Sequence, residues 1–61
     1  MDERMILLYK AVKTTNGFEV FLRGRKKPVG IYNAKYELIQ VVDYLSLPME
    51  EFVPAIIRAG I

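Results

Sequence analysis

The spacing of hydrophobic and polar positions divides this 61-residue chain near residue 33. Residues 5–13 are rich in large apolar side chains, lack glycine and proline, and predict a β-strand. The dipeptide Asn16-Gly17 follows, and it is typical of the two-residue turn of a β-hairpin. Residues 18–23 therefore predict the returning strand.

The turn assignment sets an expected pairing between these two strands. With two residues in the loop, Ala11 lies opposite Leu22 and Lys10 lies opposite Arg23. One face of the hairpin is then apolar and predicts the core. Its members are Leu7, Tyr9, Ala11, Phe18, Val20 and Leu22.

A third strand is expected in residues 28–32, PVGIY, because proline can occupy the first position of an edge strand. Antiparallel pairing of Leu22 with Val29 would add apolar side chains to the core face. The same register leaves the rings of Phe21 and Tyr32 on the outer face of the sheet, beside the cations of the hairpin.

From Asn33 onward the apolar spacing changes from two residues to 3.6 residues, which predicts helices. Asn33 is a suitable N-cap for a helix over about residues 34–45. A second helix is expected over about residues 48–59, with a kink at Pro54 and a C-cap at Gly60. The apolar stripes of the two helices are Leu38, Val41, Val42 and Leu45, and then Met49, Phe52, Val53, Ile56 and Ile57.

These elements predict an α+β fold with the order β-β-β-α-α. A three-stranded antiparallel β-sheet over residues 5–32, made of the N-terminal hairpin and a short third strand, is followed by two α-helices packed on one face. Residues 1–61 form a single small domain in this prediction. A chain of about 60 residues buries only about 60 % of its unfolded surface, whereas 52 % of these residues are apolar. We therefore expect a homodimer that covers part of the apolar surplus.

Catalysis is not expected. The chain contains no histidine or cysteine, which removes the commonest general base, the most reactive nucleophile, disulfides and the common zinc sites. Ser46 is the single serine and suits a capping role at a helix junction. Neither a P-loop nor a dinucleotide-binding fingerprint is present. We expect a protein that is not an enzyme and that has no metal, cofactor or small-molecule substrate.

Hydropathy also predicts where the protein acts. No segment approaches the ~18 consecutive apolar residues of a membrane span. The acidic start, MDER, lacks the features of a secretory signal. We therefore expect no membrane association and a cytoplasmic location.

Charge is distributed unevenly along the chain. The segment RGRKKP, residues 23–28, carries four cations, although the formal net charge of the whole chain is only +2. Residues 1–35 carry eight cations and three acids, whereas residues 36–61 carry one cation and four acids. The predicted sheet is thus basic and the predicted helices are acidic, an asymmetry that bears on possible partners.

Cations interleaved with exposed rings are typical of nucleic-acid-binding surfaces, where cations displace counterions from phosphates and rings stack on bases. In the expected register, Lys10 and Arg23 lie opposite each other next to Phe21 and Tyr32. We therefore predict a regulatory or accessory protein that binds nucleic acid, DNA in preference to RNA, through its sheet. The predicted phosphate contacts are Lys10, Lys13, Arg23, Arg25, Lys26 and Lys27, and the predicted ring contacts are Phe21 and Tyr32.

Three segments resemble DNA-binding families. RGR followed by proline is similar to the core of an AT-hook, which lays its arginines in a minor groove. The pattern over residues 18–45 resembles the three-stranded-sheet DNA-binding domains of plant ethylene-response factors and phage integrases. This second resemblance implies that the major groove is contacted by Arg23, Arg25, Lys27 and Tyr32. Residues 29–58 resemble a ribbon-helix-helix repressor, a family that dimerises through its strand.

Two other interpretations remain open. A basic turn beside an edge strand can remain solvated and keep the sheets of separate molecules from pairing. Alternatively, the protein is a protein-interaction module or homo-oligomer with no nucleic-acid role, in which the second helix offers Met49, Phe52, Ile56 and Ile61 to a partner. An acidic protein partner would also fit the charge distribution.

Overall fold

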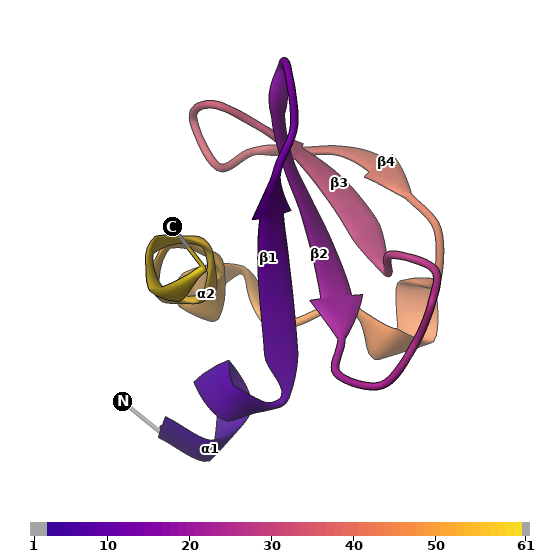
Figure 1. Ribbon diagram of the computed structural model, residues 1–61, viewed down its shortest axis with the longest axis vertical. Helices are drawn as coiled ribbons and strands as arrows, with labels where there is room; N and C mark the ends of the chain where they lie inside the picture. Colours follow the sequence, from indigo (N-terminus) through magenta and orange to yellow (C-terminus); the bar gives the residue numbers. More distant parts are fainter. Residues whose placement is uncertain (1–2, 61) are drawn as a thin grey trace.

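The computed structural model describes residues 3–60, which form a four-stranded antiparallel sheet with helices at both ends of the chain (Figure 1). The strands lie in the order β1-β2-β3-β4, with bounds β1 Tyr9–Lys13, β2 Gly17–Leu22, β3 Gly30–Asn33 and β4 Leu38–Val41. The helical elements are α1 Glu3–Leu7, the 3-10 turns η1 Tyr44–Ser46 and η2 Glu50–Phe52, and α2 Val53–Ala59. The α+β class and the antiparallel sheet are therefore confirmed, but the sheet has four strands instead of three.

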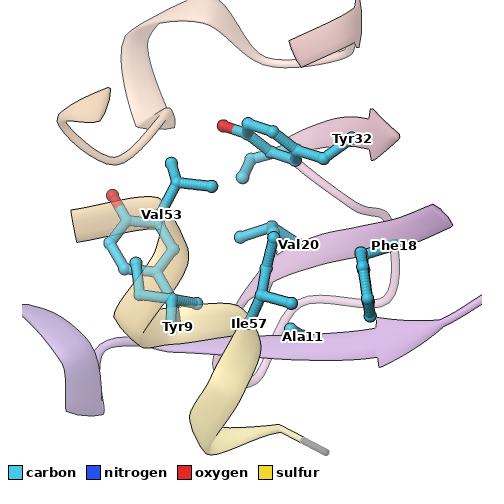
Figure 2. Close-up of a cluster of buried hydrophobic side chains, with 9 residues drawn as sticks. Tyr9, Ala11, Phe18, Val20, Tyr32, Val53 and Ile57 are labelled. Carbon is cyan, nitrogen blue, oxygen red and sulfur yellow. The ribbon is translucent and has the colours of Figure 1, made fainter. Parts of the chain in front are cut away.

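The core lies between one face of the sheet and α2, which runs beside β1 (Figure 1). Figure 2 shows side chains from β1, β2 and β3 gathered with side chains from α2 in one cluster. The buried apolar residues are Tyr9, Ala11, Phe18, Val20, Val29, Tyr32, Val53, Ile56 and Ile57. The hairpin members of this set alternate with exposed or partly exposed positions, as expected for strands with one buried face.

Helix α2 confirms the C-terminal half of the second predicted helix, but not its start at residue 48 or its kink. The helix begins at Val53, so Pro54 lies in the first turn, where a missing N–H costs nothing. Gly60 is the C-cap, as predicted, and its N–H donates to the carbonyl of Ile57 at 3.1 Å. A Cβ at Gly60 would lie 2.5 Å from the carbonyl oxygen of Ala11, so glycine also permits the close approach of α2 to β1.

The hairpin between β1 and β2 has a different turn from the predicted one. Ala11 pairs with Val20, and the N–H of Thr14 donates to the carbonyl of Gly17 at 2.8 Å, which leaves Thr15 and Asn16 as the loop. The pairing is thus shifted by two residues from the expected register. Because the side-chain period of a strand is two, this shift preserves the faces. Tyr9, Ala11, Phe18 and Val20 are buried as predicted, and Leu22 is partly buried against the core. Leu7 is exposed and belongs to α1.

The pairing between β2 and β3 differs by one residue from the expected register, and this shift reverses the faces. Val20 pairs with Gly30, and Phe18 pairs with Tyr32. Tyr32 therefore enters the core and Ile31 points to the outer side, the reverse of the prediction.

Residues 34–45 do not form the predicted helix. Asn33 starts a tight turn instead: its Oδ1 accepts hydrogen bonds from the N–H groups of Lys35 (2.9 Å) and Glu37 (3.0 Å). Tyr36 has a φ of 67°, which places it at the left-handed position of a three-residue hairpin loop. The chain then returns as β4, an uncharged strand with β-branched residues.

Two further expectations change with these elements. The start of the predicted first strand is helical, because α1 covers residues 5–7 and packs against α2. The resemblances to the sheet-and-helix DNA-binding domains and to ribbon-helix-helix repressors both required a helix in residues 34–45. Because this segment contains β4 and η1, neither resemblance extends to the fold.

Candidate nucleic-acid interface

Alternation along β1 and β2 places four side chains on the outer face of the hairpin. Lys10 pairs with Phe21, and Val12 pairs with Glu19. Lys10 and Val12 are exposed, and Glu19 and Phe21 are partly exposed. The outer face therefore combines a cation, an acid and two apolar side chains, and Lys10 lies opposite Phe21 instead of Arg23.

An open hollow of about 200 Å³ lies where this face meets the basic turn, residues 23–28. We call it the basic hollow. Its lining residues are Lys10, Val12, Phe21, Leu22, Arg23, Gly24 and Arg25. Three of these residues are cations and none is acidic, so an aromatic ring and three positive charges share one concave surface.

Arg23 is fixed at the rim of the basic hollow by two hydrogen bonds to the chain that enters β1. Its backbone N–H donates to the carbonyl of Leu8 at 2.9 Å, and its Nε donates to the carbonyl of Leu7 at 2.6 Å. A guanidinium has five N–H donors, and the bond to Leu7 uses only the one on Nε. The side chain is therefore oriented while its two Nη groups can still bind an anion.

Arg25 links the basic turn to η1. Gly24 has a φ of 86°, which glycine adopts readily, and the N–H of Arg25 donates to the carbonyl of Leu22 at 3.1 Å. Nη1 of Arg25 lies 2.8 Å from Oδ2 of Asp43 and 3.3 Å from Oγ of Ser46. The hydroxyl of Ser46 and, after it, Arg25 lower the pKa of the Asp43 carboxyl. Arg25 thus anchors the turn as well as lining the basic hollow.

The other predicted phosphate contacts lie in two places. Lys26 and Lys27 are exposed in the basic turn, beside a second open hollow of about 540 Å³. The lining residues of this turn hollow are Arg25, Lys26, Lys27, Pro28, Val29, Val42 and Asp43. Lys13 pairs with Phe18 at the far end of β1 and does not share the outer face of Lys10. Lys10, Arg23 and Arg25 therefore share the basic hollow, whereas Lys26 and Lys27 line the turn hollow, which Arg25 also lines. Lys13 lines neither.

Tyr32 does not belong to this surface. It is only 3 % exposed, and Figure 2 shows its ring in the core near Val20 and Val53. Burial raises the pKa of the Tyr32 hydroxyl, and Tyr9 and Glu50 add to the rise. The prediction that Tyr32 stacks on a base from the outer face is wrong, because the one-residue shift of β3 turns its side chain inward.

The helix surface predicted for a protein partner is also changed. Ile56 is only 2 % exposed and Phe52 packs against the core, so both contribute to the fold. Met49 is 58 % exposed, and its role in partner binding stays a prediction. Ile61 lies outside the described residues.

A group of exposed apolar side chains along β4 and η1 was not predicted. The large apolar side chains exposed there are Leu38, Ile39, Val41, Val42, Tyr44 and Leu45. A groove of about 580 Å³, here called the hairpin groove, adjoins the start of β4. It is lined by Tyr32, Lys35, Tyr36, Glu37, Leu38, Leu47, Pro48, Glu50, Val53 and Pro54. The sequence signal for this surface was the uncharged run LIQVV, which fits a strand as well as it fits a helix.

Two kinds of site are absent from the described residues. No group of three or more acidic side chains in residues 3–60 could hold a metal ion. In the same range, no helix is long and apolar enough to cross a membrane. No protein-family model, curated protein or solved structure matches this chain. The surface chemistry of the chain is therefore the basis for assigning a function.

Proposed function

We propose that this protein is a non-enzymatic accessory or regulatory factor that binds nucleic acid, with DNA as the preferred partner. The binding surface is the outer face of β1 and β2 together with the basic turn. The observation that supports this proposal is the basic hollow, which Lys10, Arg23 and Phe21 line together. Phosphates require cations and bases require a flat apolar surface, and one concave site offers both.

Each residue of the basic hollow has a distinct role in this proposal. Arg23 would bind a phosphate through its Nη groups, because its Nε bond to Leu7 already orients the guanidinium. Lys10, directly across from Phe21, would supply a second positive charge beside the ring. Phe21 would stack on a base. Because stacking needs an unpaired base, single-stranded or locally opened DNA fits this site better than an intact duplex.

The basic turn would extend the same surface along the phosphate backbone. Among the side chains of residues 4–60, no acidic group forms an ion pair with Lys26 or Lys27, whereas Arg25 is paired with Asp43. Lys26 and Lys27 therefore contribute charge that is not neutralised locally. Arg25 contributes chiefly by holding the turn against η1.

Fluorescence-anisotropy titration of labelled single-stranded and duplex DNA at about 50 and 200 mM salt tests this proposal. If Lys10, Arg23, Lys26 and Lys27 each neutralise a phosphate, this rise in salt should weaken duplex binding by about a hundredfold. Single strands should bind more tightly than duplexes at each salt concentration.

Absence of binding to either DNA at the lower salt would contradict the proposal. Polyglutamate serves as a competitor of similar charge that lacks bases. Equal displacement of DNA by polyglutamate would indicate that the surface recognises acidic proteins instead of nucleic acid.

A further inference from the structure

The edge of the sheet at β4 has a composition that exposed sheet edges usually avoid. β4 is the last strand in the sheet order, and all four of its residues are exposed. Its sequence, LIQV, contains neither a charge nor a proline, the residue types that commonly protect an exposed edge. β4 is only four residues long, and its pairing with β3 has a register shift between Ile31 and Tyr32. Its outer backbone groups can therefore pair with a short further strand, and not with a long one.

The exposed apolar side chains of β4 and η1 form one continuous run along the chain, from Leu38 to Leu45, interrupted by Gln40 and Asp43. Several exposed apolar side chains gathered at one edge mark an interaction site more often than single exposed residues do. The opposite edge differs, because α2 packs beside β1 and β1 carries Lys10 and Lys13. Of the two edge strands, β4 is thus the one without a charged residue.

The two ends of β4 have opposite charge character. Near its start, the hairpin groove carries Glu37 and Glu50 with one lysine, Lys35. Near its end, the turn hollow carries the last three cations of the basic turn against Asp43 alone. One end of the edge is therefore more acidic and the other is more basic.

We propose that β4 pairs antiparallel with β4 of a second copy of this chain. Two identical antiparallel strands are related by a two-fold axis, so both copies use the same surface and the assembly closes as a dimer. The start of one β4 then lies beside the end of the other. The acidic end of each copy consequently meets the basic end of its partner, which favours antiparallel over parallel pairing.

This arrangement has a consequence for the outer face of the sheet. The two four-stranded sheets join into one sheet of eight strands, with the two-fold axis perpendicular to it. The basic hollows of both copies then open on the same side of the joined sheet. The dimer does not require the basic hollow, which lies on β1, β2 and the start of the basic turn, but its charge pairing uses cations of the basic turn that are also proposed to contact DNA.

Sedimentation velocity from about 10 μM to about 1 mM protein, a range that covers weak association, tests the dimer. Ile39→Lys places two like charges close to the two-fold axis and should leave only monomer. Leu7→Lys is the matched control, because Leu7 is 63 % exposed and Ile39 is 60 % exposed, but Leu7 belongs to α1. The wild type and Leu7→Lys should both show a dimer fraction that rises with concentration.

A wild type that sediments as a monomer throughout this range would overturn the proposal, as would an Ile39→Lys protein that dimerises like the wild type. Amide hydrogen exchange on the wild type provides a readout that does not depend on the folding of a variant. Protection of residues 38–41 should rise with protein concentration. Protection that does not change with concentration would also overturn the proposal.

Discussion

Nη1 of Arg25 lies 2.8 Å from Oδ2 of Asp43, and this ion pair ties the basic turn to the segment that follows β4. The hydroxyl of Ser46 donates to the same carboxylate oxygen at 2.8 Å. A cation of the turn is therefore partly used for structure, and the conformation of the turn depends on an acid that lies 18 residues further along the chain.

The protonation of Asp43 should weaken this link in acid. Because the folded state lowers the pKa of Asp43, its stabilising contribution is present above the unfolded value of about 3.9 and is lost as pH falls through the lower folded value. Urea unfolding of the wild type and Asp43→Asn at several pH values measures this contribution. The wild type should be the more stable protein at pH 6, and the difference should vanish in strong acid. A difference that stays constant between pH 6 and pH 2 would contradict the assignment.

Removal of two cations from the basic hollow should weaken DNA binding, because fewer positive charges then contact the phosphates. Lys10→Ala combined with Arg23→Ala should lower affinity by about tenfold or more and reduce the magnitude of the salt slope by about two. The control, Lys35→Ala combined with Arg58→Ala, removes the same charge from exposed positions elsewhere. Anisotropy titrations at several salt concentrations give both quantities. Equal losses in the two double variants would show that net charge alone governs binding.

Phe21 should contribute through stacking and not through charge. Phe21→Leu keeps an apolar side chain but removes the ring, so binding to single-stranded DNA should weaken by about 1–3 kcal/mol with no change in salt slope. Phe21→Tyr keeps the ring and should bind like the wild type. If Phe21→Leu retains full affinity, the ring has no role in binding.

Gly17 should be intolerant of a side chain because of close contact and not because of its backbone angles. Gly17 pairs with Asn33, and a Cβ at this position would lie 2.8 Å from Cα of Asn33 and would also collide with the carbonyl of Tyr32. Gly17→Ala should therefore cost about 1–3 kcal/mol of unfolding free energy. Urea unfolding measures this cost. A positive φ is absent at Asn16, so Asn16→Ala should be close to neutral. Similar costs for both variants would favour the Asn16-Gly17 turn expected from the sequence.

The sequence was sufficient for features that depend on a side-chain period alone. Tyr9 and Ala11 are two residues apart, and their face was predicted correctly although the strand pairing was shifted by two residues. Val53 and Ile57 have helical spacing and line α2. An error of an even number of residues in the strand register does not change which face of a strand is buried. The buried face of the hairpin was therefore predicted correctly although the turn was wrong.

Tyr32 could not be placed from the sequence, because its face depends on a register that no turn residue specifies. The connection from β2 to β3 runs through the basic turn, which contains a glycine at φ 86° and is longer than a tight hairpin. One residue more or less in that connection decides whether Tyr32 or Ile31 enters the core. The observed choice buries Tyr32, opposite Phe18.

β4 was misread because its apolar residues fit two periods. Leu38, Val41 and Val42 have helical spacing, yet they also belong to an uncharged segment with β-branched residues. The deciding feature is the turn at Asn33, whose side chain bonds to the backbone of the loop instead of capping a helix. Tyr36 adopts the left-handed conformation in that loop, and the centroid of its ring lies 5.8 Å from the centroid of the Phe18 ring. The spacing of nearby residues cannot predict a contact between residues so far apart in the sequence.

The most direct test of the proposed function is an NMR titration of isotope-labelled protein with a short single-stranded DNA, which maps the binding surface residue by residue. We expect the largest shift changes at the amides of Lys10, Phe21 and Arg23, with smaller changes in the basic turn. Amides of Tyr32 and of α2 should change little, because they lie in the core and beyond it. Changes concentrated at β4 or α2, or no changes at all, would contradict the assignment of the basic hollow as the nucleic-acid site.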